Sequence, residues 1–178
     1  MEYKRLYVFV EGQDDKNFFE KIIKPKFEKE YNEVKVELYA EESFEWRRKY
    51  IRSIRKIKAA DYIYVADINN APCVTAKKQK IKNIDKDKII VVIKEIEGWY
   101  LAGLDDTNSK RLKIPTVTTT DTITKEQFNR LISKNSSRIN CMLEILKCFS
   151  LKIAWQKNTS FNYFVEKYKI KGEGKTEN

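Results

Sequence analysis

Three acidic residues, Glu11, Asp67 and Glu97, each lie just beyond a short apolar segment. If these segments are parallel strands of one sheet, their carboxyl ends meet at the edge where such sheets bind ligands. Carboxylates gathered there repel one another unless a cation lies between them, and oxygen ligands favour Mg²⁺ or Mn²⁺. The spacing therefore predicts a metal site, and Gly12 would let a ligand approach the backbone closely. The competing interpretation is that each acid caps a helix N-terminus, which we favour for Asp14.

The composition excludes several kinds of active site. The 178 residues include no histidine, so Ser-His-Asp triads, histidine zinc ligands and imidazole proton transfer are all excluded. The three cysteines, Cys73, Cys141 and Cys148, form no Cys-x-x-Cys pair, so we expect neither a zinc site nor a disulfide framework. Catalysis would have to depend on carboxylates, hydroxyls, lysines or a bound metal.

Charge and hydropathy indicate a folded, basic protein. Lys and Arg number 36 against 26 Asp and Glu, a net charge of +10, and 42% of the residues are hydrophobic. The longest clean apolar run, Ile89–Ile93, is far shorter than a membrane span. The first ten residues lack the apolar core and cleavage site of a secretory leader. We therefore expect a cytoplasmic protein without membrane association.

Apolar periodicity predicts strands that alternate with helices over the first part of the chain. Strands are expected at residues 3–10, 34–39, 62–66 and 88–93. Helices are expected at residues 18–31 (with a kink at Pro25), 44–58, 74–84 and 95–104. This alternation predicts an α/β domain over residues 1–105, with a Rossmann-like, mostly parallel four-stranded sheet and helices on both faces.

The remainder of the chain has a different pattern. Residues 115–122 are rich in threonine and are expected to be extended or looped. Three apolar stripes at helical spacing follow, over residues 124–132, 139–149 and 161–168. Thr124 and Gln127 have the spacing of a capping box at the start of the first. We expect a C-terminal helical layer, residues 106–171, packed on the α/β domain, and a disordered tail, residues 172–178.

Three motifs resemble those of the toprim (topoisomerase–primase) fold. The segment VFVEGQDDKNFF, residues 8–19, resembles the first motif, where an apolar strand ends in Glu-Gly and an acidic residue four places on begins a helix. The segment YIYVAD, residues 62–67, resembles the second motif, although Asp67-Ile68-Asn69 replaces the usual Asp-x-Asp. The segment EIEGWYL, residues 95–101, is similar to the Glu-x-Glu-Ala-Trp-Leu-Leu stretch of compact toprim-like proteins related to OLD-family nucleases.

This resemblance, which covers residues 1 to about 105, implies roles for individual residues. Glu11 matches the catalytic general acid/base, and Asp67 matches the first metal-binding aspartate. Asn69 offers a neutral carbonyl oxygen, and Asp15 and Glu97 are the further expected metal ligands. Toprim enzymes use Mg²⁺ in phosphodiester chemistry. No tyrosine stands in a topoisomerase context, and the chain leaves no room for gate domains. The resemblance thus implies an Mg²⁺-dependent nuclease or a related phosphotransfer protein.

The predicted helix over residues 44–58 concentrates positive charge opposite its apolar stripe, and residues 77–82 form a second basic segment. Basic faces attract phosphates without regard to base sequence, and Trp46 and Tyr50 could stack on unpaired bases. The competing interpretation is an ordinary solvated helix surface in a lysine-rich protein. The predicted nucleic-acid contacts are Arg47, Arg48, Arg52, Arg55 and Lys56.

Two other functions stay open. The first is a toprim-like protein that binds nucleic acid or a partner protein, or pairs as a homodimer, without cutting. Asn69 favours it, because an amide holds a cation less strongly than a carboxylate. The second is a receiver-like phosphoacceptor, since Asp14-Asp15, Asp67 and Lys94 imitate its acidic pocket. That alternative leaves Glu11 and the following glycine unexplained.

Overall fold

The computed structural model describes residues 2–132 and 137–171. The tail over residues 172–178, for which we expected disorder, lies outside the described residues. The chain forms two compact units, Met1–Val92 and Ile93–Asn178. This division precedes the helix α5 (Ile96–Ala102), whereas we expected a domain boundary after residue 105. The second unit includes α5 because this helix packs against later helices, α8 and α9.

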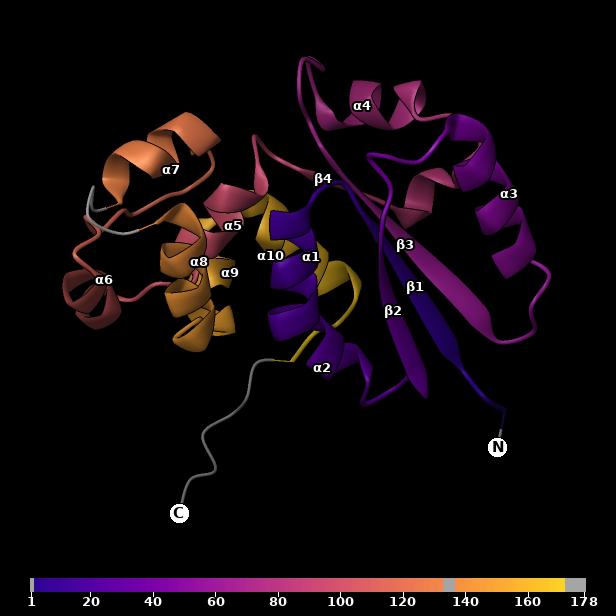
Figure 1. Ribbon diagram of the computed structural model, residues 1–178, viewed down its shortest axis with the longest axis horizontal. Helices are drawn as coiled ribbons and strands as arrows, with labels where there is room; N and C mark the ends of the chain where they lie inside the picture. The colour runs from indigo at the N-terminus through magenta and orange to yellow at the C-terminus, as the bar shows by residue number, and fades with distance from the viewer. Residues whose placement is uncertain (1, 133–136, 172–178) are drawn as a thin grey trace. The chain divides into compact units, whose positions relative to one another are not determined.

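The first unit contains a parallel four-stranded sheet. Its strands are β1 (Arg5–Val10), β2 (Glu33–Leu38), β3 (Ala60–Asp67) and β4 (Ile89–Val92). They lie in the order β2-β1-β3-β4, and every neighbouring pair is parallel (Figure 1). The predicted α/β class with a four-stranded parallel sheet is therefore confirmed.

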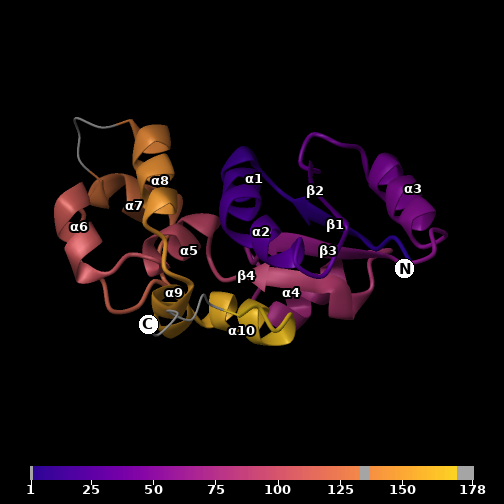
Figure 2. The same cartoon turned by 90° about the horizontal axis from the view of Figure 1, so that it is seen from below.

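Helices cover both faces of this sheet, as predicted. Along the sheet, the connection from β1 to β2 runs toward one edge, and the connection from β2 to β3 runs back toward the other. Because both crossovers are expected to be right-handed, the helices of the first connection lie on one face and the helix of the second lies on the opposite face. Figure 1 and Figure 2 show α1 and α3 on opposite sides of the strands. The helical segments of this unit are α1 (Gln13–Phe18), the π-helix η1 (Phe19–Ile23), α2 (Lys24–Phe27), α3 (Phe44–Ile54), α4 (Val74–Lys80) and the 3₁₀ helix η2 (Lys86–Lys88).

The face under α3 has an aromatic core. Its ring-bearing members come from β1, β3 and the end of β2, and Ile51 and Ile54 of α3 pack on them. Tyr39 stacks on Tyr64 with ring centroids 4.5 Å apart. The buried rings on this face are Tyr7, Phe9, Tyr39, Tyr62 and Tyr64. Because successive side chains of a strand alternate between faces, these tyrosines fix which face of the sheet α3 covers.

The second unit is helical in its described part. Besides α5, it contains α6 (Asp106–Leu112), α7 (Lys125–Leu131), α8 (Arg138–Lys147), α9 (Leu151–Lys157) and α10 (Thr159–Lys167). The predicted capping box is confirmed, because the Thr124 amide donates to Oε1 of Gln127 at 2.9 Å and the Gln127 amide donates to Oγ1 of Thr124 at 3.3 Å. The sequence did not predict α6 and α9. None of the helices in residues 2–132 and 137–171 is long and apolar enough to cross a membrane.

A buried polar network fixes α10 within this unit. Asn158, the N-cap of α10, accepts from the Phe161 amide at 2.9 Å and donates to Oγ1 of Thr120 at 3.0 Å. Ser160 Oγ donates to Asn158 Oδ1 at 2.8 Å and accepts from the indole Nε1–H of Trp99, also at 2.8 Å. Each of these buried polar groups therefore has a hydrogen-bond partner, as burial requires.

Candidate functional site

The first unit has a topological switch point between β1 and β3. β1 is central, with β2 on one side and β3 on the other, and ligands of open parallel sheets bind at the carboxyl ends of such strands. Glu11 follows the last residue of β1, and Asp67 is the last residue of β3. The register pairs Phe9 with Tyr64, so Glu11 is level with the residue immediately before Asp67. The structure thus brings these two predicted acids to one edge of the sheet, at the position where open parallel sheets form their ligand-binding crevice, and we call this position the crevice.

Glu11 lies beside two stacked tyrosines. The side chain of Glu11 is half-buried, whereas Tyr39 and Tyr64 are buried. Burial raises the pKa of both phenols, and the negative charge of Glu11 raises it further. The Tyr39 hydroxyl donates to the carbonyl of Val65 at 2.9 Å. The Tyr39 amide also donates to the carbonyl of Val10, the residue before Glu11, at 3.0 Å, and we call the two stacked rings the tyrosine wall beside Glu11.

Asp15 takes part in starting helix α1. Its buried carboxylate accepts a hydrogen bond from the Gly12 amide at 3.2 Å, which is one half of a capping interaction. Because Gly12 directly follows Glu11, this hydrogen bond places Asp15 next to the same crevice. One oxygen of this predicted metal ligand is therefore already used by the helix N-terminus. Gly12 itself is extended, with φ −130°.

Asn69 lies in a tight turn just after β3. The turn is closed by the Ala71 amide, which donates to the Ile68 carbonyl at 3.1 Å. Asn69 has φ 49°, in the left-handed region that asparagine and aspartate adopt more readily than other non-glycine residues. The backbone here therefore favours either residue, and an aspartate at this position would fit the same turn.

Glu97 is held by an ion pair within the second unit. It lies in the first turn of α5, its side chain is only 5% exposed, and its carboxylate accepts from Nη2 of Arg138. The Arg138 guanidinium lies over the ring of Phe128, 5.9 Å from its centroid. Burial raises the pKa of Glu97, although Arg138 opposes this effect. The ion pair explains this carboxylate without a metal ion.

Three of the predicted oxygen donors belong to the first unit and are the candidates for holding a metal ion. In residues 2–132 and 137–171, no group of three or more acidic or cysteine side chains gathers closely enough to form a metal cage. Mg²⁺ commonly takes only one or two carboxylates and completes its shell with water and substrate phosphates. Glu11, Asp67 and the amide oxygen of Asn69, all from the first unit, are donors of this kind.

The predicted basic residues of α3 differ in what they contact. Nη1 of Arg47 donates to the Tyr64 hydroxyl at 3.3 Å, and its guanidinium lies over the Tyr39 ring. Arg48 forms an ion pair with Glu45 at 2.7 Å. Arg52 and Lys56 are exposed. Arg47 therefore links the first turn of α3 to the tyrosine wall beside Glu11. The spacing of charges in the sequence did not predict this contact.

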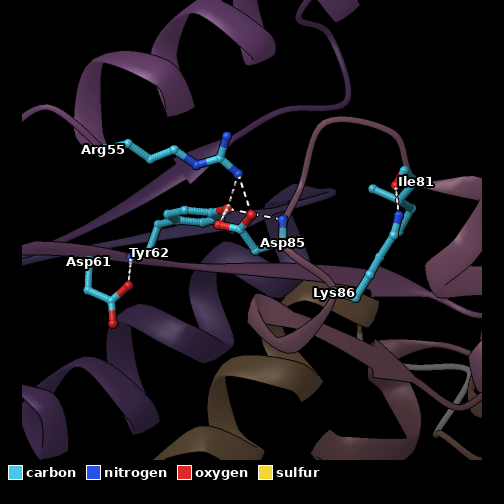
Figure 3. Close-up of polar contacts among 6 residues, drawn as sticks. All are labelled: Arg55, Asp61, Tyr62, Ile81, Asp85 and Lys86. Atoms are coloured by element: carbon cyan, nitrogen blue, oxygen red, sulfur yellow. Dashed lines mark hydrogen bonds and ion pairs between the residues drawn. The ribbon is translucent and has the colours of Figure 1, made fainter.

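Arg55 belongs to a structural network (Figure 3). Its Nη2 donates to the Tyr62 hydroxyl at 3.0 Å and to Oδ1 of Asp85 at 2.7 Å. The same hydroxyl donates to Oδ2 of Asp85 at 2.7 Å. The hydrogen bond from Tyr62, together with the charge of Arg55, lowers the pKa of Asp85. Arg55, which we predicted as a nucleic-acid contact, thus ties the end of α3 to the loop before β4.

No protein-family model, curated protein or solved structure matches this chain. The relationship to the toprim fold therefore stays a prediction from the three motifs.

Proposed function

We propose that this protein is an Mg²⁺-dependent nuclease, or a related phosphotransfer enzyme, that acts on nucleic acid. The observation that carries the proposal is the placement of Glu11 and Asp67 at the carboxyl ends of adjacent parallel strands, on either side of the switch point. Acids on both sides of the position where such sheets bind ligands suit metal-assisted phosphodiester hydrolysis.

Each residue of the crevice has a role in this proposal. Asp67 and the carbonyl oxygen of Asn69 would hold the ion, which when bound offsets charge on phosphate oxygens and lowers the pKa of water. Glu11 would accept a proton from the attacking water and return it to the departing oxygen. The wall formed by Tyr39 and Tyr64 would limit the access of bulk water to Glu11 and keep this carboxylate in one place.

Positive charge supports nucleic acid as the substrate. The net charge of +10 favours association with polyanions, and Arg52 and Lys56 are exposed on and just after α3. These contacts would be insensitive to base sequence. Because Arg55 is engaged by Asp85 and Tyr62, it adds less to such binding than its exposed neighbours.

A second candidate is a protein that binds nucleic acid without cutting it. Two observations favour it: an amide, Asn69, stands where a second carboxylate would hold a cation more firmly, and the described residues contain no group of three acids or cysteines placed for a metal. The two candidates share the crevice and the basic surface, and they differ only in whether bonds are broken.

A cleavage assay separates the two candidates. Labelled single- and double-stranded DNA and RNA would be incubated with the protein in Mg²⁺, in Mn²⁺ or in EDTA. We expect metal-dependent cleavage that Glu11→Gln and Asp67→Asn abolish and that Asn69→Asp increases. Glu28→Gln, which neutralises an exposed acid just after α2, is the matched control and should cleave normally.

Two outcomes of this assay contradict the nuclease proposal. Binding without cleavage in every metal would establish the second candidate. Cleavage that survives in both Glu11→Gln and Asp67→Asn would show that the crevice is not the active site.

A further inference from the structure

A second feature of the first unit is a basic pocket of about 350 Å³. Its walls come from the first turns of α3, from β3 and from the segment that follows α4. Among the described residues that line it, four are cationic and none is acidic. The lining residues that matter here are Phe44, Arg47, Arg48, Tyr64, Lys80 and Lys82. We call this cavity the basic pocket.

The cations of the basic pocket lie on two opposing segments. Arg47 and Arg48 come from α3, and Lys80 and Lys82 come from the end of α4 and the loop after it. The Nε–H of Arg48 is buried and finds no hydrogen-bond acceptor among the described residues, although Nη2 pairs with Glu45. Guanidinium groups bind phosphates through paired N–H donors, so the two arginines that line the pocket are suited to a phosphate there.

Aromatic rings complete the pocket. Phe44, the first residue of α3, is 46% exposed, so its ring is open to a ligand in the pocket. Tyr64 forms another part of the lining and is itself supported by the stacked ring of Tyr39. The exposed ring of Phe44 can stack on a nucleic-acid base of any identity, whereas buried Tyr64 supports the pocket wall. The volume is at the small end of the range for ligand pockets, which suits a single nucleotide.

The loop that forms one wall is held in place without a ligand. Nζ of Lys86 donates to the carbonyl of Lys78 at 2.8 Å and to that of Ile81, which ties down the end of α4. Asp85 is fixed by Arg55 and by a neighbouring tyrosine, as Figure 3 shows. The pocket is therefore preformed, which lowers the entropy lost when a ligand binds.

We propose that the basic pocket binds a nucleotide that carries a terminal phosphate monoester, either as a free nucleotide or as the phosphorylated end of a strand. The phosphate would lie between Arg47, Arg48, Lys80 and Lys82, and the base would lie against Phe44. A monoester carries a charge of about −1.5 to −2, against −1 for a diester, so it matches four clustered cations better.

This proposal deepens the proposed function, because it names which part of a nucleic acid the protein holds. It rests on nucleic acid as the substrate class but not on the metal. Tyr64 joins the two sites, because it lines the basic pocket and its backbone pairs in the sheet with Phe9, two residues before Glu11. A strand whose phosphorylated end occupied the pocket would thus begin next to the crevice between β1 and β3.

The test measures binding in EDTA, by isothermal titration, with four probes: adenosine, adenosine 5′-monophosphate, and a tetranucleotide with or without a 5′-phosphate. We expect each phosphorylated probe to bind at least tenfold more tightly than its unphosphorylated counterpart. Lys80→Ala combined with Lys82→Ala should remove that advantage. Lys21→Ala combined with Lys29→Ala loses the same charge from exposed positions outside the pocket and should retain it. Circular dichroism would verify that both variants fold.

The probes also identify the source of the phosphate. Tighter binding of the phosphorylated tetranucleotide assigns the pocket to a strand end, and equal or tighter binding of the mononucleotide assigns it to a free nucleotide. Equal affinity for phosphorylated and unphosphorylated probes, or the same loss in both double variants, would overturn the proposal. Because the assay contains no metal, its failure is distinguishable from a failure of metal-dependent cleavage.

Discussion

Removal of one hydroxyl group, in Tyr62→Phe, tests how firmly the loop before β4 is held. That hydroxyl donates to Asp85 at 2.7 Å and accepts from Nη2 of Arg55 at 3.0 Å and from the Asp85 amide at 3.2 Å. A hydrogen bond to a charged group contributes about 1.5–3 kcal/mol, but the Asp85 side chain is 49% exposed, so water can replace part of it. We therefore expect a loss of about 1–2 kcal/mol in the free energy of unfolding, or roughly 2–8 °C in Tm.

The loss should depend on pH, and its sign follows from Asp85. The pKa of Asp85 is lowered in the folded protein, chiefly by the hydrogen bond from Tyr62. A carboxylate with a lowered pKa stabilises the fold above its unfolded pKa, near 3.9, and this contribution is lost as the pH falls through the folded pKa. The difference between wild type and Tyr62→Phe should accordingly be largest near pH 7 and smaller near pH 3.

Urea denaturation at both pH values, followed by circular dichroism, measures these differences. Tyr3→Phe is the matched control, because it removes a hydroxyl from a ring that is 53% exposed. A loss for Tyr62→Phe no greater than that of the control at pH 7 would refute the stabilising role of the network. A loss of equal size at both pH values would refute the part assigned to the charge of Asp85.

Three further predictions concern the second unit, and urea denaturation measures each. Arg138→Met should lower the free energy of unfolding by about 3–5 kcal/mol at pH 7, because it leaves Glu97 charged and buried. Because the pKa of Glu97 is raised in the folded protein, stability falls as the pH rises through that pKa, and the loss should be smaller at pH 5. Asn158→Ala should lower the free energy of unfolding by about 2–3 kcal/mol, because it removes a buried N-cap. The control Asn129→Ala, at an exposed asparagine, should change it little. Gly103→Ala should cost about 1–3 kcal/mol, because the added methyl group would overlap the ring of Phe149, and wild-type stability would contradict this packing.

The sequence predicted the elements whose signals are local. β1 and β3 are largely apolar segments, each followed by or ending in an acid. The start of α7 is indicated by a capping box, whose two residues, Thr124 and Gln127, are only three positions apart. α6 and α9 escaped prediction because the apolar residues of each are too few to form a stripe that stands out. Their N-caps, Asp105 and Ser150, were the available signals.

The partners of the charged residues were harder to predict, because they come from distant positions. Glu97 pairs with Arg138 across 41 residues, and Arg55 pairs with Asp85 across 30. No local pattern specifies such a pair, since it depends on how helices and loops pack. We predicted Glu97 as a metal ligand because it follows a strand and resembles a family motif, and Arg55 as a nucleic-acid contact because arginines cluster on its helix. The structure adds the partner of each, an ion pair that neither pattern indicated.

The position of β2 at one edge of the sheet bears on how this protein avoids aggregation. An edge strand exposes unpaired backbone groups to which another chain could add a strand. Along β2, buried Val34 and Val36 alternate with exposed Lys35 and half-buried Glu37, and Glu33 is paired with Lys35 and with Arg5. An incoming strand would have to bury these charges. At the opposite edge, β4 is only four residues long and offers a short template. Both edges of the sheet thus discourage β-sheet association between copies of the chain.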